Sequence, residues 1–98
     1  MSLAEELKMK REGKLVDHAI EFAENIQPQL AKSAESGYTG FRVDLEGRDD
    51  AHILKDKEFI GNLELLLDGC KVKIDEKEYT NLLFNNKYYK HYLVINWI

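Results

Sequence analysis

Cysteine, proline and long apolar runs are scarce in this chain of 98 residues. Cys70 is the single cysteine, which excludes an intrachain disulfide framework and is typical of a reducing compartment. No apolar run approaches the roughly 18 residues that a membrane-spanning helix needs. Near the start of the chain stand Glu5 and Glu6, whereas a signal peptide would have a basic and then an apolar segment there. We therefore expect a cytoplasmic protein without a membrane partner.

Basic charge is in deficit as well. The chain has 14 Lys and Arg against 18 Asp and Glu, a net charge of -4. Proteins that bind nucleic acids are more often basic, so the charge weighs against nucleic acid as a partner. A glycine-rich phosphate loop is also missing, because no helical pattern follows Gly37 and Gly40. We expect no cofactor.

Apolar periodicity predicts a long amino-terminal helix. Ser2 and Glu5 have the spacing of a capping box, so a helix is able to start at once. Pro28 predicts a kink or break in this helix, and Gly37 predicts its end. The apolar stripe recurs at steps of three and four residues and consists of Val16, Ala19, Ile20, Ala23, Ile26, Leu30 and Ala34.

Beyond Gly37 the pattern alternates between strands and a second helix. A period of two predicts a strand over Tyr38 to Leu45, and Asp56 is a suitable N-cap for the helix that ends at Gly69. Alternation from Cys70 predicts a second strand. The stretch from Asp75 to Phe84 suits either a helix or a strand, and we favour a short helix or turn.

The final segment, Tyr88 to Ile98, reads as the strongest strand and is expected to be docked in a sheet. The whole chain, residues 1 to 98, is then one α+β domain. The architecture expected is a two-layer sandwich with the long helix and the second helix packed on a small three-stranded mixed sheet. The crossover helix between the first two strands predicts that these two run parallel.

Two surfaces are candidates for interaction. On the last strand, Leu93, Ile95 and Trp97 share the face expected in the core, while Tyr88 and Tyr92 lie opposite and would be exposed. Tyrosine is enriched at the energetically important centres of interfaces. On the first helix an acidic outer face carries Asp17, Glu21 and Glu24, with His18 beside them expected to be solvated.

Carboxylates suggest an alternative, a small metal-dependent nuclease or hydrolase. Asp49, Asp50 and His52 share one loop, and Asp44 and Asp75 stand at predicted strand ends. Solvated surface charges are the simpler interpretation, so we predict no catalytic or metal-binding residue. Sequence alone leaves open whether these five side chains converge on a metal.

Nucleic-acid binding is a further alternative. Lys8, Lys10, Arg11 and Lys14 form a basic cluster at the start of the first helix. Glu5, Glu6 and Glu12 dilute its charge, which weakens the case for an accessory protein that binds nucleic acid there.

Four segments carry a resemblance to a known group of proteins. They are a helix end at Ala34-Glu35-Ser36-Gly37, a strand at Phe41-Arg42-Val43, a helix end at Leu67-Asp68-Gly69 and the closing Leu93-Val94-Ile95-Asn96-Trp97. With them the chain resembles small proteins encoded by phages and prophages of Gram-positive bacteria, from which it departs by the insertion Asp75 to Tyr88. That group has no established shared active site, so no functional residue is carried over. The resemblance implies a small accessory or host-interacting protein of the bacterial cytoplasm.

The hypothesis that these observations favour is a non-enzymatic interaction module. Its partner is expected to be a host or phage protein, or a second copy of the chain.

Overall fold

The computed structural model describes residues 2–98, which form an α+β fold with a long helix, two shorter helices and a three-stranded sheet. The first helix, α1, is continuous over Leu3–Glu35. The Ser2 hydroxyl accepts the Glu5 amide at 3.2 Å, so the predicted cap is present. Gly37 follows the helix with φ of +92°, a conformation that favours glycine.

The kink or break predicted at Pro28 is not a break, since α1 runs through this residue to Glu35. Pro28 and Glu24 are both exposed, so the carbonyl that loses its helical hydrogen bond lies on the solvent side. Ile26 and Leu30, on either side of the proline, both pack on the core.

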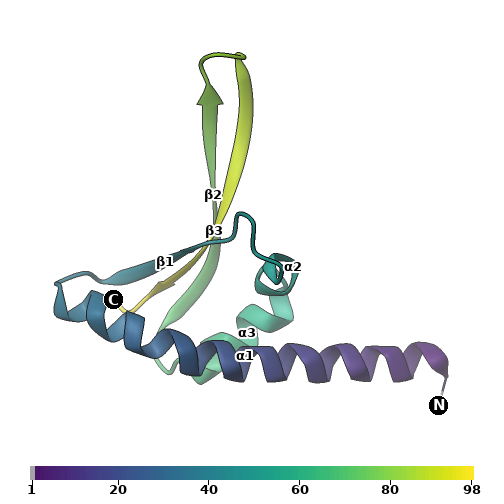
Figure 1. Cartoon of the computed structure of the whole chain (residues 1–98). Coiled ribbons are helices and arrows are strands. Elements are labelled where there is room, and N and C mark those ends of the chain that lie inside the picture. The colour runs from purple at the N-terminus through teal and green to yellow at the C-terminus, as the bar shows by residue number, and fades with distance from the viewer. Residues whose placement is uncertain (1) are drawn as a thin grey trace.

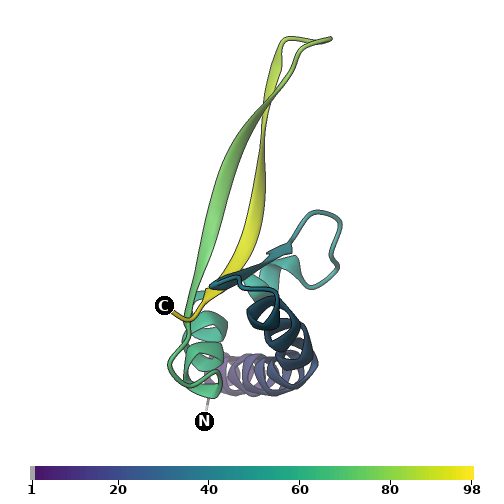
Figure 2. The same ribbon diagram turned by 90° about the vertical axis from the view of Figure 1, so that its left-hand side faces the viewer.

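Two helices follow the first strand, β1 (Gly40–Asp44). The single-turn α2 (Ala51–Leu54) was not predicted from the sequence. The predicted second helix is α3 (Lys57–Leu66), and its N-cap is Asp56, whose carboxylate accepts the Glu58 amide at 2.9 Å. The helix pair α1 and α3 lies on one side of the sheet (Figures 1 and 2).

The remaining chain forms two long strands, β2 (Lys71–Asn81) and β3 (Asn86–Asn96). The short helix or turn favoured for residues 75–84 is wrong over residues 75–81, which continue β2, whereas residues 82–84 lie in the turn that joins β2 to β3. The residues of this stretch suit a helix or a strand about equally well. Hydrogen bonding to β3 decides for a strand, since Tyr79 pairs with Tyr88 and Asn81 pairs with Asn86.

The sheet has the order β1-β3-β2, with β3 in the middle. Strands β1 and β2 point the same way, as the crossover predicted, but each pairs antiparallel with β3. The expected mixed pairing is therefore corrected to an antiparallel sheet. The reason is that β2 and β3 are joined by a short turn, which imposes antiparallel pairing, and β3 then separates β2 from β1.

The core lies between the helices and the facing side of the sheet. Leu93 and Ile95 of β3 are fully buried, as the alternation predicted. Trp97 lies beyond β3 and is only half-buried, with its amide donating to Thr39 at 3.0 Å. The other buried apolar residues are Leu15, Ala19, Ala23, Ile26, Val43, Leu45, Leu54, Phe59, Leu63, Leu67 and Val72.

No helix within residues 2–98 has the length and apolar character needed to cross a membrane.

Candidate functional site

Strands β2 and β3 extend well beyond the rest of the sheet. Strand β1 pairs with β3 only over residues 92–96, whereas β2 pairs with β3 along its whole length. The segment Lys77 to Lys90 is therefore a two-stranded hairpin, called here the hairpin arm, which projects away from the helices (Figures 1 and 2). An isolated two-stranded hairpin has little stability of its own in water, so its own cross-strand contacts have to hold it.

The end of the arm carries three consecutive large apolar side chains, called here the apolar tip. Leu82, Leu83 and Phe84 are 92%, 89% and 71% exposed. The turn itself is ordered by polar groups: the Asn81 side chain accepts the Leu83 amide at 3.0 Å, and Asn85 adopts φ of +53°, which asparagine tolerates better than most residues. The sequence therefore builds a defined turn that holds apolar groups in solvent.

The side of the sheet opposite the helices is called here the open face. Cross-strand partners share a face, and Leu93 and Ile95 point to the helices, so their neighbours Tyr92 and Val94 point away from them. The same register places a mixed set of side chains on the open face. Its members are Gly40, Arg42, Asp44, Lys71, Lys73, Asp75, Lys77, Tyr79, Asn81, Asn86, Tyr88, Lys90, Tyr92, Val94 and Asn96.

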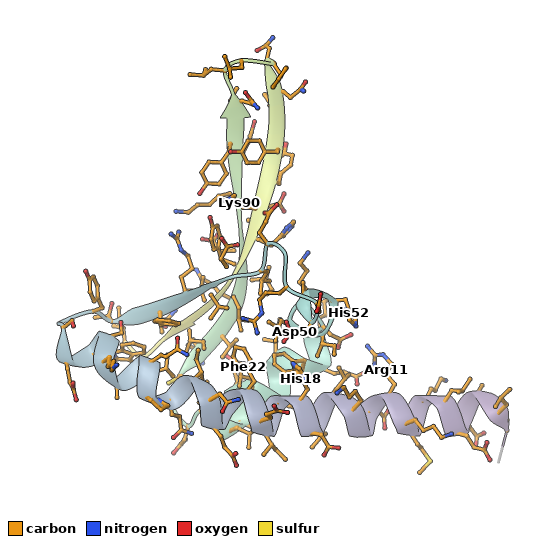
Figure 3. The ribbon with its side chains drawn as sticks, in the orientation of Figure 1. Arg11, His18, Phe22, Asp50, His52 and Lys90 are labelled. Atoms are coloured by element: carbon orange, nitrogen blue, oxygen red, sulfur yellow. The ribbon has the colours of Figure 1, made fainter. Side chains whose placement is uncertain are left out.

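Tyrosines link the arm to the body along the open face. Tyr79 stacks on Tyr88 with ring centroids 5.5 Å apart and rings inclined by 15°. The Tyr79 hydroxyl lies 3.1 Å from the Tyr92 hydroxyl, and Arg42 lies 4.3 Å over the Tyr92 ring. Lys90, well away from the helices in Figure 3, has its Nζ atom 5.7 Å from the centre of the Tyr79 ring.

This arrangement changes the expectation for the two tyrosines proposed as interaction residues. Tyr88 is exposed, as expected, but Tyr92 is only 6% exposed. Although no helix covers it, Arg42 and Tyr79 lie against its ring and hydroxyl. The hydrogen bond with Tyr79 raises the pKa of Tyr92 to about 12, with smaller contributions from desolvation and the nearby charge of Asp44. Tyr92 is thus a structural link rather than a free contact residue.

A second polar cluster joins the loop before α2 to α1. His18 Nε2 lies 2.9 Å from a carboxylate oxygen of Asp50, and the two side chains face each other in Figure 3. Arg48 donates to the same carboxylate at 2.9 Å. These contacts lower the pKa of Asp50 to about 2, the Arg48 hydrogen bond being the largest cause. The solvated His18 expected from the sequence is corrected, because the loop folds back onto this side of α1 and the His18 ring also lies 5.8 Å from that of Phe59.

The other carboxylates considered for a metal site are dispersed. Asp44 and Asp75 flank Tyr92 on the open face, whereas Asp49 and His52 are exposed near α2. Within residues 2–98, no three side chains of metal-binding type gather into one group.

The acidic face of α1 is present as predicted. Asp17, Glu21 and Glu24 are exposed. In the basic cluster nearer the start of the helix, Arg11 forms ion pairs with Asp56 and with Glu58, the latter at 3.4 Å. Part of that cluster therefore ties α1 to the start of α3.

Several shallow hollows border the helices, and two of them are the largest by volume. One, of about 550 Å³, lies between the end of α1 and β1 and is lined by Tyr38 and Arg42 among others. The other, of about 570 Å³, lies between α1 and α3 beside Val16 and Leu65. Within residues 2–98 no buried polar side-chain atom lacks a hydrogen-bond partner, so neither hollow presents an unsatisfied group to a ligand.

Sequence reasoning missed the apolar tip. The signal was three large apolar residues, Leu82 to Phe84, enclosed by Asn81 on one side and Asn85 on the other. Asparagine pairs mark turns, and a turn that contains consecutive large apolar residues places them in solvent. The expectation of a short helix or turn over residues 75–84 does not by itself indicate that these apolar residues are exposed.

Comparison with protein-family models, with curated proteins and with solved structures gives no match to this chain.

Proposed function

We propose that this protein is a non-enzymatic interaction module that binds a protein partner through the apolar tip of its hairpin arm. The observation that carries this function is the exposure of Leu82, Leu83 and Phe84 at the far end of a projecting hairpin. Keeping this surface in water is unfavourable by roughly 25 cal/mol per Å² of apolar area. Contiguous exposed apolar surface of this kind marks interaction sites more often than scattered apolar residues do.

The shape of the tip indicates the shape of the partner. A convex group of three side chains on a narrow arm needs a concave apolar pocket to cover it. The Tyr79–Tyr88 stack lies a few residues below the turn and braces the two strands, so that the tip is held out from the body before binding. Such preorganisation reduces the conformational entropy that binding costs.

The exposed Tyr88 and the acidic residues Asp17, Glu21 and Glu24 are secondary surfaces in this proposal. Tyr88 is three residues from the end of the turn and extends the contact that the tip makes. The acidic residues lie on α1, far from the tip along the arm, and serve to discriminate between partners by charge.

A triple variant tests the proposal. Replacing Leu82, Leu83 and Phe84 by serine keeps the turn-forming Asn81 and Asn85 and removes the apolar surface. A partner protein that the wild type captures from a lysate of host cells should not be captured by the variant. Size-exclusion chromatography of both proteins shows in parallel whether the partner is a second copy, in which case the variant alone elutes as a monomer.

Leu65→Ser is the matched control, because Leu65 is an exposed leucine of α3 on the opposite part of the molecule. It should retain the partner. A wild-type protein that stays monomeric and retains no partner contradicts the proposal, and so does a triple variant that binds as well as the wild type.

A further inference from the structure

Basic charge is concentrated on the open face, although the chain as a whole is acidic. The chain has 14 basic and 18 acidic side chains, of which this face carries five basic and two acidic ones. The rest of the molecule therefore carries nine basic and sixteen acidic side chains. The two carboxylates are Asp44 and Asp75. The five basic residues are Arg42, Lys71, Lys73, Lys77 and Lys90.

These five cations are free of carboxylate partners. The ion pairs within residues 2–98 involve Arg11, His18, Arg48, Lys87 and His91, none of which lies on the open face. Arg42 and Lys90 lie over tyrosine rings instead, at 4.3 Å and 5.7 Å from the ring centres. The positive charge of the face is therefore available to an anionic ligand.

Aromatic surface lies within the same field of charge. Tyr88 is 44% exposed and stacks on Tyr79 with one side of its ring. The other side has no aromatic partner among residues 2–98. A planar group that arrives on this other side can stack there, because every nucleobase has a π-face that suits a tyrosine ring.

We infer that the open face binds single-stranded nucleic acid. The five cations contact successive phosphates, and Tyr88 stacks on an unpaired base. This ligand is favoured over duplex because the base faces are hidden inside a duplex. A membrane surface is disfavoured because no exposed leucine, isoleucine or phenylalanine lies among the lysines of this face.

The dimensions agree with a short strand. With a rise of about 3.3 Å per residue, the distance along β2 from Lys71 to Tyr79 is about 26 Å. Known single-strand sites cover roughly 4 to 16 nucleotides. The inference goes beyond the proposed function, since the open face shares only Tyr88 with the proposed protein contact and leaves the apolar tip free for a protein.

Fluorescence anisotropy with labelled 12-nucleotide oligo-dT and oligo-U tests it. Binding should be measurable at about 50 mM salt. The logarithm of the association constant should fall with the logarithm of the salt concentration, with a slope of up to about -3.5, because each of five phosphates contributes roughly -0.7. The double variant K73E/K77E should bind at least about tenfold more weakly and with a shallower slope. Tyr88→Leu should weaken binding by roughly 5- to 100-fold with the slope unchanged, because it removes stacking and no charge.

The control K8E/K10E has the same charge change on the exposed start of α1 and should stay within about twofold of the wild type. Circular dichroism of each variant establishes that it is folded. The inference is overturned if the wild type does not bind at about 50 mM salt, or if K8E/K10E loses as much affinity as K73E/K77E. Unchanged binding by Tyr88→Leu, or binding to phosphatidylserine vesicles without binding to either oligonucleotide, also overturns it.

Discussion

Strand β3 passes through two different environments within eleven residues. Near its end, Leu93 and Ile95 face the helices and have no exposed surface, whereas Tyr88 and Tyr89 in the arm are 44% and 53% exposed. The body is held by apolar burial between two layers. The arm is held by backbone pairing, by the Tyr79–Tyr88 stack and by a hydrogen bond between tyrosines.

The difference separates stability from function in this fold. Burial stabilises the body, since a fully buried leucine contributes roughly 1.5–3 kcal/mol relative to an exposed one. The arm has no layer of helices on either face, and the side chains of its apolar tip are largely exposed. Side chains that the fold does not use are available to a ligand or partner, which is why both proposals involve the arm.

The largest expected effect comes from comparing the same substitution in the two regions. Leu93→Ala leaves a cavity in the core and should lower the free energy of unfolding by about 2–5 kcal/mol. Leu83→Ala removes an exposed side chain and should change it by less than about 0.5 kcal/mol. Urea unfolding followed by circular dichroism measures both. Similar losses for the two variants would show that the arm packs against the body.

A smaller effect concerns the polar contacts that tie the loop before α2 to the body. Asp50→Asn should lower the free energy of unfolding by about 1 kcal/mol at neutral pH, because it weakens the contacts of Asp50 with His18 and Arg48. The folded pKa of about 2 is lower than the ordinary value of 3.8, so this stabilisation is complete above pH 4 and is lost as the pH falls toward 2. Unfolding at several pH values tests this.

Asp49→Asn is the control, since its exposed carboxylate forms no ion pair within residues 2–98. Its effect should be small at every pH. If the difference between wild type and Asp50→Asn stays constant from neutral pH to pH 2, the carboxylate does not act through its charge.

The smallest effect on global stability is expected where the arm joins the body. Tyr79→Phe removes the hydroxyl that contacts Tyr92, so the pKa of Tyr92 should fall from about 12 toward the ordinary value of 10.0. Ultraviolet titration of the phenolate detects this shift, and amide exchange should become faster in the arm but not in residues 92–96. Tyr38→Phe, which replaces an exposed tyrosine near the end of α1, should leave the highest tyrosine pKa unchanged. An unchanged Tyr92 titration in Tyr79→Phe would mean that the hydroxyl contact does not form in solution.

The candidate surfaces were only partly predictable. Exposure of Tyr88 and of the acidic residues Asp17, Glu21 and Glu24 followed from strand alternation and helical periodicity. Burial of Tyr92 did not, because it depends on Arg42, fifty residues earlier in the chain. The contact between His18 and Asp50 was unpredictable for the same reason, since a loop has no periodicity that reveals what it folds against.

By itself, the sequence determined the elements with strong local signals. Capping by Ser2 and Asp56 follows from interactions between residues a few positions apart. The burial of Leu93 and Ile95 follows from strand alternation, and helical periodicity predicts the buried Ala19, Ala23 and Ile26 of α1, although Val16 and Ile20 of the same stripe are exposed. Tertiary structure alone decided the central place of β3, the extension of β2 to Asn81 and the projection of the arm. The physical reason is that the periodicity of apolar residues indicates only which face of a helix or strand is apolar. Pairing between distant strands determines which neighbour covers that face and where the sheet is left uncovered.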